Sequence, residues 1–152
     1  MDTEMIEGVV VTPLKIIPVD QGNVLHAMRR SDPEFLTFGE AYFSEVKEGA
    51  IKGWKKHRQM ILNLIVVVGK IRLVVFDDRL ESDTRGDYFD IVLSPSDNYS
   101  RLTIYPELWV AFEGIGVGSN LLLNLASIEH DPTEAENIPV ATGKIIYPTF
   151  QR

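Results

Sequence analysis

Short apolar segments separated by turn-forming residues run through almost the whole chain, and this pattern limits the fold more than any other feature of the sequence. The segments are rich in Val, Ile, Leu, Phe or Tyr, and several alternate apolar with polar residues, as strands with one buried face do. Clusters of Gly, Pro, Asn, Asp and Ser lie between them. Strands repeated at this short spacing are typical of a β-sandwich or a closed β-barrel. The expected strand-forming segments are residues 5–19, 36–46, 61–68, 70–78, 87–94, 101–106, 108–114 and 119–127, with 143–149 as a further candidate.

The sequence gives little sign of helix and no sign of a second domain. No long segment repeats its apolar residues with the period of a helix, and only short helices around Asp32–Leu36 or Pro132–Ile138 are compatible with the pattern. The glycine-rich run 114–120 is expected to form a hairpin turn. Because the 152 residues contain no repeat, low-complexity tract or linker, we expect a single domain spanning residues 1–152.

Charge and cysteine content exclude several classes of function. A net charge of −7 argues against a nucleic-acid surface, although it leaves room for a local basic pocket that binds one small phosphorylated ligand. The most apolar stretch, residues 61–76, is interrupted by polar residues and is too short to cross a bilayer as a helix, so no membrane contact is expected. The chain has no cysteine and starts with an acidic segment, which favours a cytoplasmic protein without disulfides.

Histidine is too scarce and too scattered to predict a metal site. The three histidines are His26, His57 and His130, and His57 stands without a second histidine nearby. Zinc and iron sites made by proteins commonly use two or three histidines together with carboxylates. We therefore expect no metal and no other cofactor, and a metal-dependent oxygenase or isomerase is the weakest of the hypotheses.

A basic cluster stands out in this acidic chain and marks the best candidate site. On a strand, Lys55 and His57 share a face, so that inside a barrel either of them is placed to act as a general base. Lys52 and Arg58 are candidates for holding a pyrophosphate, as a point charge and a forked donor. The alternative is an exposed, charged strand end that keeps a sheet edge soluble.

Three further residues are candidates for substrate contact. Trp109 can stack on a base or a sugar ring, although a single tryptophan is more often part of the core. Asn63 and Asn124 each interrupt an apolar strand segment, and a buried amide in such a segment must be hydrogen-bonded. Each asparagine therefore either contacts a ligand in the barrel or bonds to a neighbouring strand.

Several short motifs follow one another in a characteristic order along the chain. They are Asp20 with Gly22, the pair Glu34–Phe35, Ser44 followed by residues 49–53, residues 76–79, Ile104–Tyr105–Pro106 with Phe112, and the segment 130–136. These motifs are weak singly but more specific in their order, and they cover roughly residues 7–138. In this order the chain resembles the dTDP-4-dehydrorhamnose 3,5-epimerase family of cupins and the related sugar-nucleotide 3,4-ketoisomerases.

The resemblance implies an all-β fold, a cupin-type jelly-roll β-barrel that forms a homodimer and binds a nucleotide-linked 4-keto sugar in its interior. It implies an enzyme without a metal that removes a proton beside the ketone and returns a proton on the opposite face. In such epimerases a histidine is the base and a tyrosine is the acid, while arginine and lysine side chains hold the pyrophosphate and sugar.

The chain departs from the family at several of these positions. The family's R-G-x-H pattern becomes Lys52-Gly53-Trp54-Lys55, with His57 at the second histidine position of the ketoisomerases, and the position of the catalytic tyrosine holds Leu123. These differences favour a single epimerisation or a keto–keto isomerisation over a double epimerisation. The expected function is therefore an isomerase or epimerase of a nucleotide-linked 4-keto-6-deoxy sugar in deoxysugar or polysaccharide synthesis. The alternative is a cupin that binds a sugar nucleotide without converting it.

Overall fold

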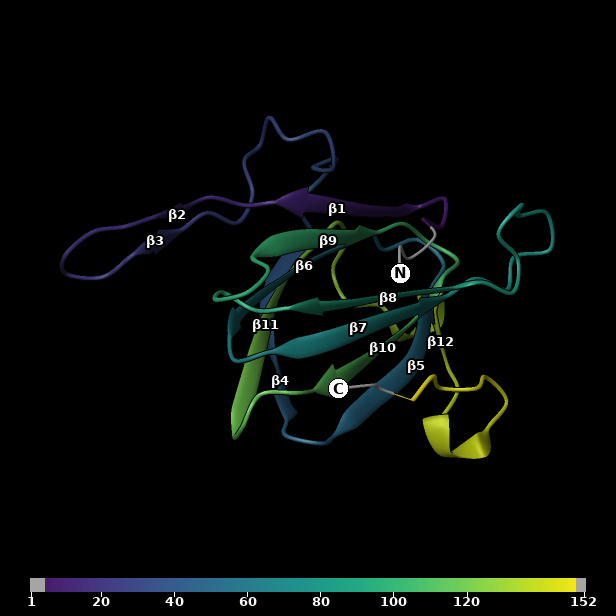
Figure 1. Ribbon diagram of the computed structural model, residues 1–152. Helices are drawn as coiled ribbons and strands as arrows, with labels where there is room; N and C mark the ends of the chain where they lie inside the picture. Colours follow the sequence, from purple (N-terminus) through teal and green to yellow (C-terminus); the bar gives the residue numbers. More distant parts are fainter. Residues whose placement is uncertain (1–4, 150–152) are drawn as a thin grey trace.

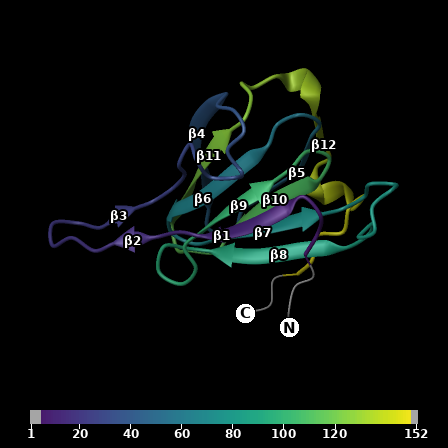
Figure 2. The same ribbon diagram turned by 90° about the horizontal axis from the view of Figure 1, so that it is seen from above.

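Two five-stranded antiparallel sheets face each other in the computed structural model, which describes residues 5–149 (Figures 1 and 2). The two ends of the predicted domain, residues 1–4 and 150–152, lie outside the described part. In the first sheet the order is β1 (Val9–Pro13), β9 (Ser100–Ile104), β6 (Leu62–Val68), β11 (Ser119–Ala126) and β4 (Glu40–Lys47). In the second sheet it is β12 (Ala135–Asn137), β5 (Ile51–His57), β10 (Trp109–Gly114), β7 (Ile71–Phe76) and β8 (Tyr88–Leu93).

Most successive strands from β4 to β11 lie in different sheets, which is the arrangement of a jelly roll, so the predicted all-β jelly roll is confirmed. The chain crosses from the first sheet to the second between β4 and β5 and between β6 and β7, and it crosses back between β10 and β11. The glycine-rich run 114–120 is therefore a connection between sheets, and the prediction of a hairpin turn was wrong. The barrel is not closed by a continuous strand ladder, since between the described parts of β4 and β10 only a bridge from Glu48 to Gly114 links the two sheets.

The remaining elements are short. A 3-10 turn, η1 (Pro132–Glu134), leads directly into β12, so only the start of the expected helix 132–138 is helical. The Asp32–Leu36 segment is a turn closed by a bond from the Phe35 N–H to the Asp32 carbonyl (3.0 Å). Residues 143–149 form no strand but follow the 3-10 turn η2 (Val140–Thr142). Within residues 5–149 no helix is long and apolar enough to cross a membrane.

The main core lies between the sheets because alternate side chains of each strand point inward. β11 shows the pattern most clearly, with Asn120, Leu122, Asn124 and Ala126 buried while the residues between them are partly exposed. Leucine, isoleucine and valine side chains from both sheets fill the space between them. Asn120 is a polar side chain within this buried region. Its Oδ1 accepts from the Lys70 N–H (2.8 Å) and its Nδ2 donates to the Val46 carbonyl (3.0 Å), so that it links the turns at that end of the barrel.

The outer face of the first sheet is covered by the segment that precedes β4. Arg101 is almost fully buried under this segment and donates to the Glu34 carboxylate (2.9 Å), the Asp32 carboxylate (3.3 Å) and the Ala27 carbonyl (2.8 Å). This cover explains why β9 is buried on both faces, since an uncovered sheet face would leave these polar groups in water.

The outer face of the second sheet is covered by the C-terminal segment. Ile145 and Tyr147 pack there with Trp54 and Trp109 as part of a second apolar cluster. Tyr147 also donates to Glu113 (2.6 Å), and burial of the phenol together with this bond raises its pKa well above the ordinary value. Residues 143–149 therefore pack on this face without forming the strand expected there.

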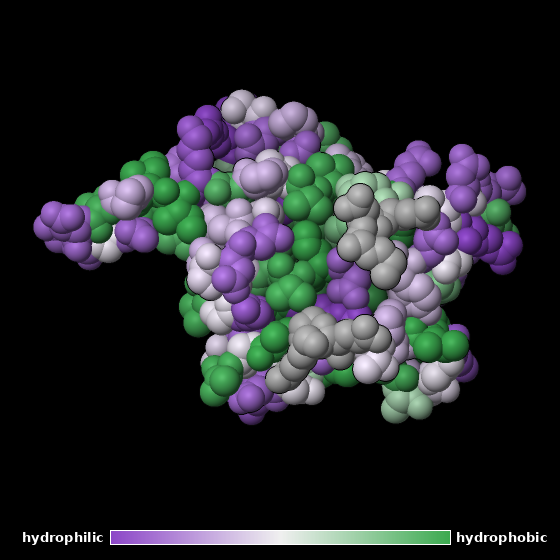
Figure 3. All heavy atoms as spheres, viewed as in Figure 1, coloured by the Kyte–Doolittle hydropathy of each residue, from purple (hydrophilic) through white to green (hydrophobic). Residues whose placement is uncertain are grey.

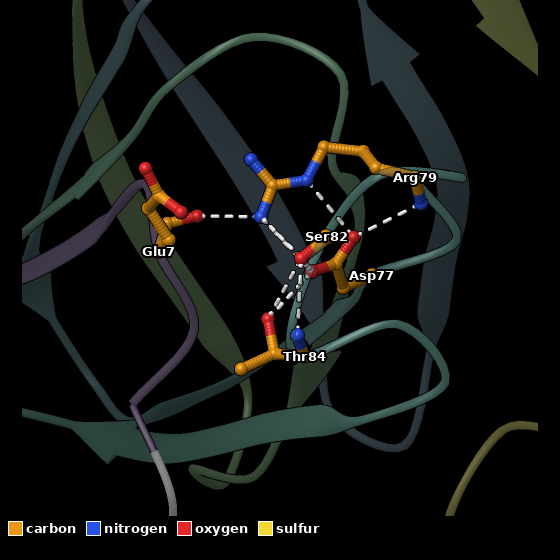
Figure 4. Close-up of polar contacts among 5 residues, drawn as sticks. All are labelled: Glu7, Asp77, Arg79, Ser82 and Thr84. Atoms are coloured by element: carbon orange, nitrogen blue, oxygen red, sulfur yellow. Dashed lines mark hydrogen bonds and ion pairs between the residues drawn. The ribbon is translucent and has the colours of Figure 1, made fainter.

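A buried carboxylate organises the loop between β7 and β8. Asp77 is fully buried and accepts hydrogen bonds from Arg79, Ser82 and Thr84, while Arg79 also donates to the Glu7 carbonyl (2.7 Å) (Figure 4). Burial alone would raise the pKa of Asp77, but these bonds outweigh it and hold the pKa far below the ordinary value. The network therefore fixes the loop to the segment that precedes β1.

A two-stranded arm, β2 (Ile16–Ile17) with β3 (Val24–Leu25), projects from the body of the molecule (Figures 1 and 2). Apolar side chains are exposed along it, among them Val19 and Val24, behind a hydrophilic tip (Figure 3). Leu36 and Phe38, in the segment that precedes β4, are also exposed. Exposed apolar side chains grouped in this way are unusual on a surface that faces only water.

Candidate active site

A cavity of about 450 Å³ opens between the two sheets, bounded mainly by β5 and β10 on one side and by β4, β6 and β11 on the other. Its floor is apolar and is made by Leu62, Leu64, Val110, Phe112 and Leu122. Its polar lining consists of Tyr42, Ser44, Lys52, Lys55, His57, Asn124 and Asn137. An apolar cavity with a few convergent polar groups is the usual form of a small-molecule site.

A β-bulge brings both lysines and the histidine to the same wall. Lys52 and Lys55 are three residues apart, so a regular strand would point them to opposite faces. In the ladder with β10, however, Lys52 pairs with Phe112 and Lys55 pairs with Val110, so one extra residue is accommodated in β5. The bulge therefore turns Lys52 inward, on the same side as Lys55 and His57.

The bulge depends on Gly53. At this position the backbone of β5 lies so close to β10 that an added Cβ would come within 2.6 Å of the Ala111 Cβ. A larger residue would have to push the two strands apart. Gly53 thus shapes the cavity wall that carries Lys52 and Lys55.

His57 is paired with a buried carboxylate. Its Nδ1 lies 2.5 Å from Oε1 of Glu134, and both side chains are almost fully buried. The other Glu134 oxygen accepts from the backbone N–H groups of Arg58 (3.1 Å) and Gln59 (3.0 Å). Burial alone would raise the pKa of Glu134, but the bonds from His57 and the backbone lower it below the ordinary value.

This pairing determines which nitrogen of His57 can react. An ionised carboxylate only accepts hydrogen bonds, so Nδ1 of His57 carries the proton and donates to Glu134. In the neutral ring the free electron pair then lies on Nε2. The negative charge of Glu134 also stabilises the imidazolium that forms when Nε2 takes up a proton. The pairing with Glu134 therefore leaves Nε2 as the nitrogen of His57 that can accept a proton.

The opposite wall carries hydroxyl and amide groups. Tyr42 and Ser44 alternate along β4, on the same face as the buried Val46, and the Asn124 side chain donates to the Tyr42 hydroxyl (2.9 Å). Lys52 reaches toward this wall from β5 and donates to the Ser44 hydroxyl (2.9 Å). Hydroxyl and amide groups thus face His57 across an apolar floor, and the Lys52 ammonium group reaches toward them from the wall that carries His57.

Four of the seven residues predicted from sequence line this cavity: Lys52, Lys55, His57 and Asn124. The structure does not bring the other three to it. Arg58 follows the end of β5, has a half-exposed side chain and pairs with Glu136 (2.6 Å). Its position just past the strand end directs it to solvent.

Asn63 and Trp109 lie on the outer faces of their sheets. The Asn63 side chain accepts from the Thr103 hydroxyl (2.7 Å), because its neighbours in β6, Leu62 and Leu64, take the inward positions. Trp109 packs in the outer cluster and donates from Nε1 to Asp78 (2.8 Å). Both side chains have structural partners, and we assign neither of them to substrate contact.

Two residues that matter at the site were not found by sequence reasoning. Glu134 comes from the segment 130–136, which carried part of the family resemblance, but nothing in the sequence pairs it with His57. Tyr42 lies in a segment whose alternation of Tyr42, Ser44 and Val46 predicts a shared face. Among residues 5–149 no group of three or more His, Asp or Glu side chains is arranged to hold a metal ion.

Known proteins with the same fold and a related sequence define the family. No protein-family model matches the chain. The crystal structure of a dTDP sugar isomerase from Desulfovibrio desulfuricans G20 shares 37% identity with it, with a TM-score of 0.91 over 94% of this chain and 91% of that one. The match in both sequence and structure extends over nearly the full length of both chains.

Two more distant relatives carry related descriptions. A probable low-salt glycan biosynthesis epimerase, Agl13 of Haloferax volcanii, is 25% identical over 138 residues and 88% of each chain. NovW of Streptomyces spheroides, a 4-keto-6-deoxy sugar epimerase, shares the fold with a TM-score of 0.81 and 21% identity, over 97% of this chain and 78% of that one. The cupin-type fold expected from the sequence is thereby confirmed, and the chain belongs to the family of dTDP-sugar isomerases and epimerases.

Proposed function

We propose that this protein isomerises a dTDP-linked 4-keto-6-deoxy sugar by moving a proton at a carbon beside the ketone. The observation that carries the proposal is the buried His57–Glu134 pair on the wall of a cavity that also presents Lys52 and Lys55. The family relatives convert dTDP sugars or 4-keto-6-deoxy sugars, which supports this class of substrate.

The residues divide the work by their chemistry. Nε2 of His57 removes a proton from the carbon beside the ketone, and the electron pair of the broken C–H bond leaves an enolate. Lys55 lies two residues before His57 on the same wall and stabilises the negative charge on the enolate oxygen. Lys52, nearer the exposed end of β5, attracts the pyrophosphate of the nucleotide.

Solvent deuterium provides the test of this function. The protein is incubated with dTDP-4-keto-6-deoxyglucose in deuterated water and the sugar is followed by proton NMR. We expect deuterium at C3 or C5, the two carbons beside the ketone, together with a new isomer. Tight binding with neither exchange nor isomer would instead identify a binding protein without catalysis, and absence of both binding and exchange would contradict the substrate class.

We further propose that the chain, residues 1–152, acts as a single domain within a cytoplasmic homodimer. The absence of cysteine fits a reducing compartment, and two-fold dimers are the commonest assemblies of soluble proteins. The exposed apolar side chains of the arm and of Leu36 and Phe38 supply a surface for a second copy.

Sedimentation equilibrium should accordingly give about twice the chain mass of 17.2 kDa. Replacing Phe38 with aspartate should shift the protein to the mass of one chain, because a charge would be buried in the interface. Val117, which is 90% exposed and lies at the other end of β4 from Phe38, offers the matched control, and Val117→Asp should leave the dimer intact. A single-chain mass for the unaltered protein would contradict the dimer.

A further inference from the structure

Building on the proposed function, we infer that Tyr42 is the proton donor that completes the reaction from the wall opposite His57. Epimerisation needs an acid on the face of the sugar ring that the base does not reach. The family's tyrosine position holds Leu123 in this chain, and Leu123 does not line the cavity. The cavity lining instead includes the tyrosine Tyr42, which belongs to β4 and not to β11.

Tyr42 and His57 belong to different sheets, so a ring between the sheets has one residue on each face. β4 and β5 are consecutive strands joined by the turn at Gly49, and they run in opposite directions away from it. Tyr42 lies seven residues before Gly49, whereas Lys55 and His57 lie six and eight residues after it. The three side chains therefore lie at a similar height above the turn, around the same cavity.

The hydrogen bonds around Asn124 determine the direction in which Tyr42 can donate. Oδ1 of Asn124 accepts from the backbone N–H of Asn63 (3.1 Å), which fixes the amide so that its NH₂ group points to Tyr42. An amide NH₂ only donates, so the Tyr42 oxygen is the acceptor in that bond. The hydroxyl proton of Tyr42 is consequently not used by Asn124 and is available to a ligand in the cavity.

The step balances without any further reactant. The Tyr42 O–H bond breaks, its proton joins the carbon of the enolate on the face away from His57, and the enolate returns to a ketone. The electron pair stays on the phenolate oxygen, where the hydrogen bond from the Asn124 amide offsets its charge. His57 then releases its proton to water and Tyr42 takes one from water, so nothing is oxidised or reduced.

Tyr42→Phe separates the two halves of the reaction and tests the inference. Because His57 remains, the variant should still exchange the proton beside the ketone for deuterium, within about fivefold of the unaltered rate. Formation of the epimer should fall about 100-fold or more, because the acid is missing. A role of Tyr42 in structure or binding alone would slow exchange and product formation together, and equal product formation in the variant would also overturn the inference.

Asn124→Asp provides an independent variant of nearly the same shape. Its carboxylate still accepts the Asn63 N–H, but it can no longer donate to Tyr42 and instead draws the hydroxyl proton to itself. Product formation should therefore fall while deuterium exchange persists, as in Tyr42→Phe. Tyr105→Phe, at a tyrosine outside the cavity lining, is the matched control and should keep both rates.

The controls distinguish this inference from the proposed function. Thermal unfolding and dTDP binding establish that each variant is folded, which is expected because Tyr42 lies on an edge strand and is 40% exposed. If the unaltered protein exchanges no deuterium, the proposed function fails. If it exchanges and forms product but Tyr42→Phe does the same, only the assignment of the acid fails.

Discussion

Replacing His57 with asparagine is expected to lower the rate of deuterium exchange and of isomer formation by about 10²–10⁴-fold, the usual contribution of a general base. Asparagine can still donate to Glu134 but cannot take up a proton from carbon. Because the cavity walls and both lysines remain, the variant should bind dTDP within a few-fold of the unaltered protein. NMR exchange rates together with calorimetric dTDP titrations separate the two effects.

Matched variants identify which residue is the base. Lys55→Met should slow the reaction through loss of charge near the enolate, yet it should leave measurable exchange because His57 keeps its carboxylate partner. Glu134→Gln should reduce the rate less than His57→Asn, since Glu134 positions the ring without touching the sugar. His130→Asn, at an exposed histidine, should change nothing. Exchange that survives in His57→Asn but disappears in Lys55→Met would make Lys55 the base.

Replacing Asp77 with asparagine should produce the largest loss of stability, about 3 kcal/mol of unfolding free energy at neutral pH, as for other broken buried ion pairs. The amide would leave the Arg79 guanidinium without its bidentate partner and would direct NH₂ toward the donors that now bond the carboxylate. For a chain of this size the expected decrease in Tm is about 6–12 °C. Urea unfolding measures the free energy directly.

The pH dependence of this effect has a defined sign. The pKa of Asp77 is lowered in the folded protein, so its contribution to stability is complete above its unfolded value, near 4, and is lost as the pH falls further. The unfolding free energies of Asp77→Asn and the unaltered protein should therefore differ most near neutral pH and converge in acid. Asp83→Asn, at an exposed aspartate in the same loop, should match the unaltered protein at every pH. A constant difference between pH 7 and pH 3 would contradict the assignment.

The strand pattern of the sequence predicts most of the fold because alternation in one strand reports directly on one buried face. The predicted strand segment 119–127 contains β11 (Ser119–Ala126), which places Asn124 inward, as the alternation of its residues indicates. The same reasoning fails for Asn63, since β6 is covered on both faces and its outward side chain is as buried as its inward neighbours. A single sequence does not reveal which segment covers a sheet from outside.

The site depends on contacts that no local pattern contains. Lys52 joins Lys55 on the cavity wall only because a bulge at Gly53 changes the register of β5. Glu134 lies 77 residues from His57 in the chain and reaches it through a 3-10 turn that precedes β12. Both features arise from packing between distant segments, and the basic cluster in the sequence marks only one side of the resulting cavity.

A crystal structure of the His57→Asn variant with dTDP-4-keto-6-deoxyglucose would show directly how the sugar lies relative to residue 57. The sugar ring is expected in the cavity between the sheets, with a carbon beside the ketone facing residue 57 and the Tyr42 hydroxyl on the other face of the ring. The pyrophosphate should lie near Lys52. A nucleotide sugar bound elsewhere, or a sugar whose ketone and neighbouring carbons point away from residue 57, would contradict the account.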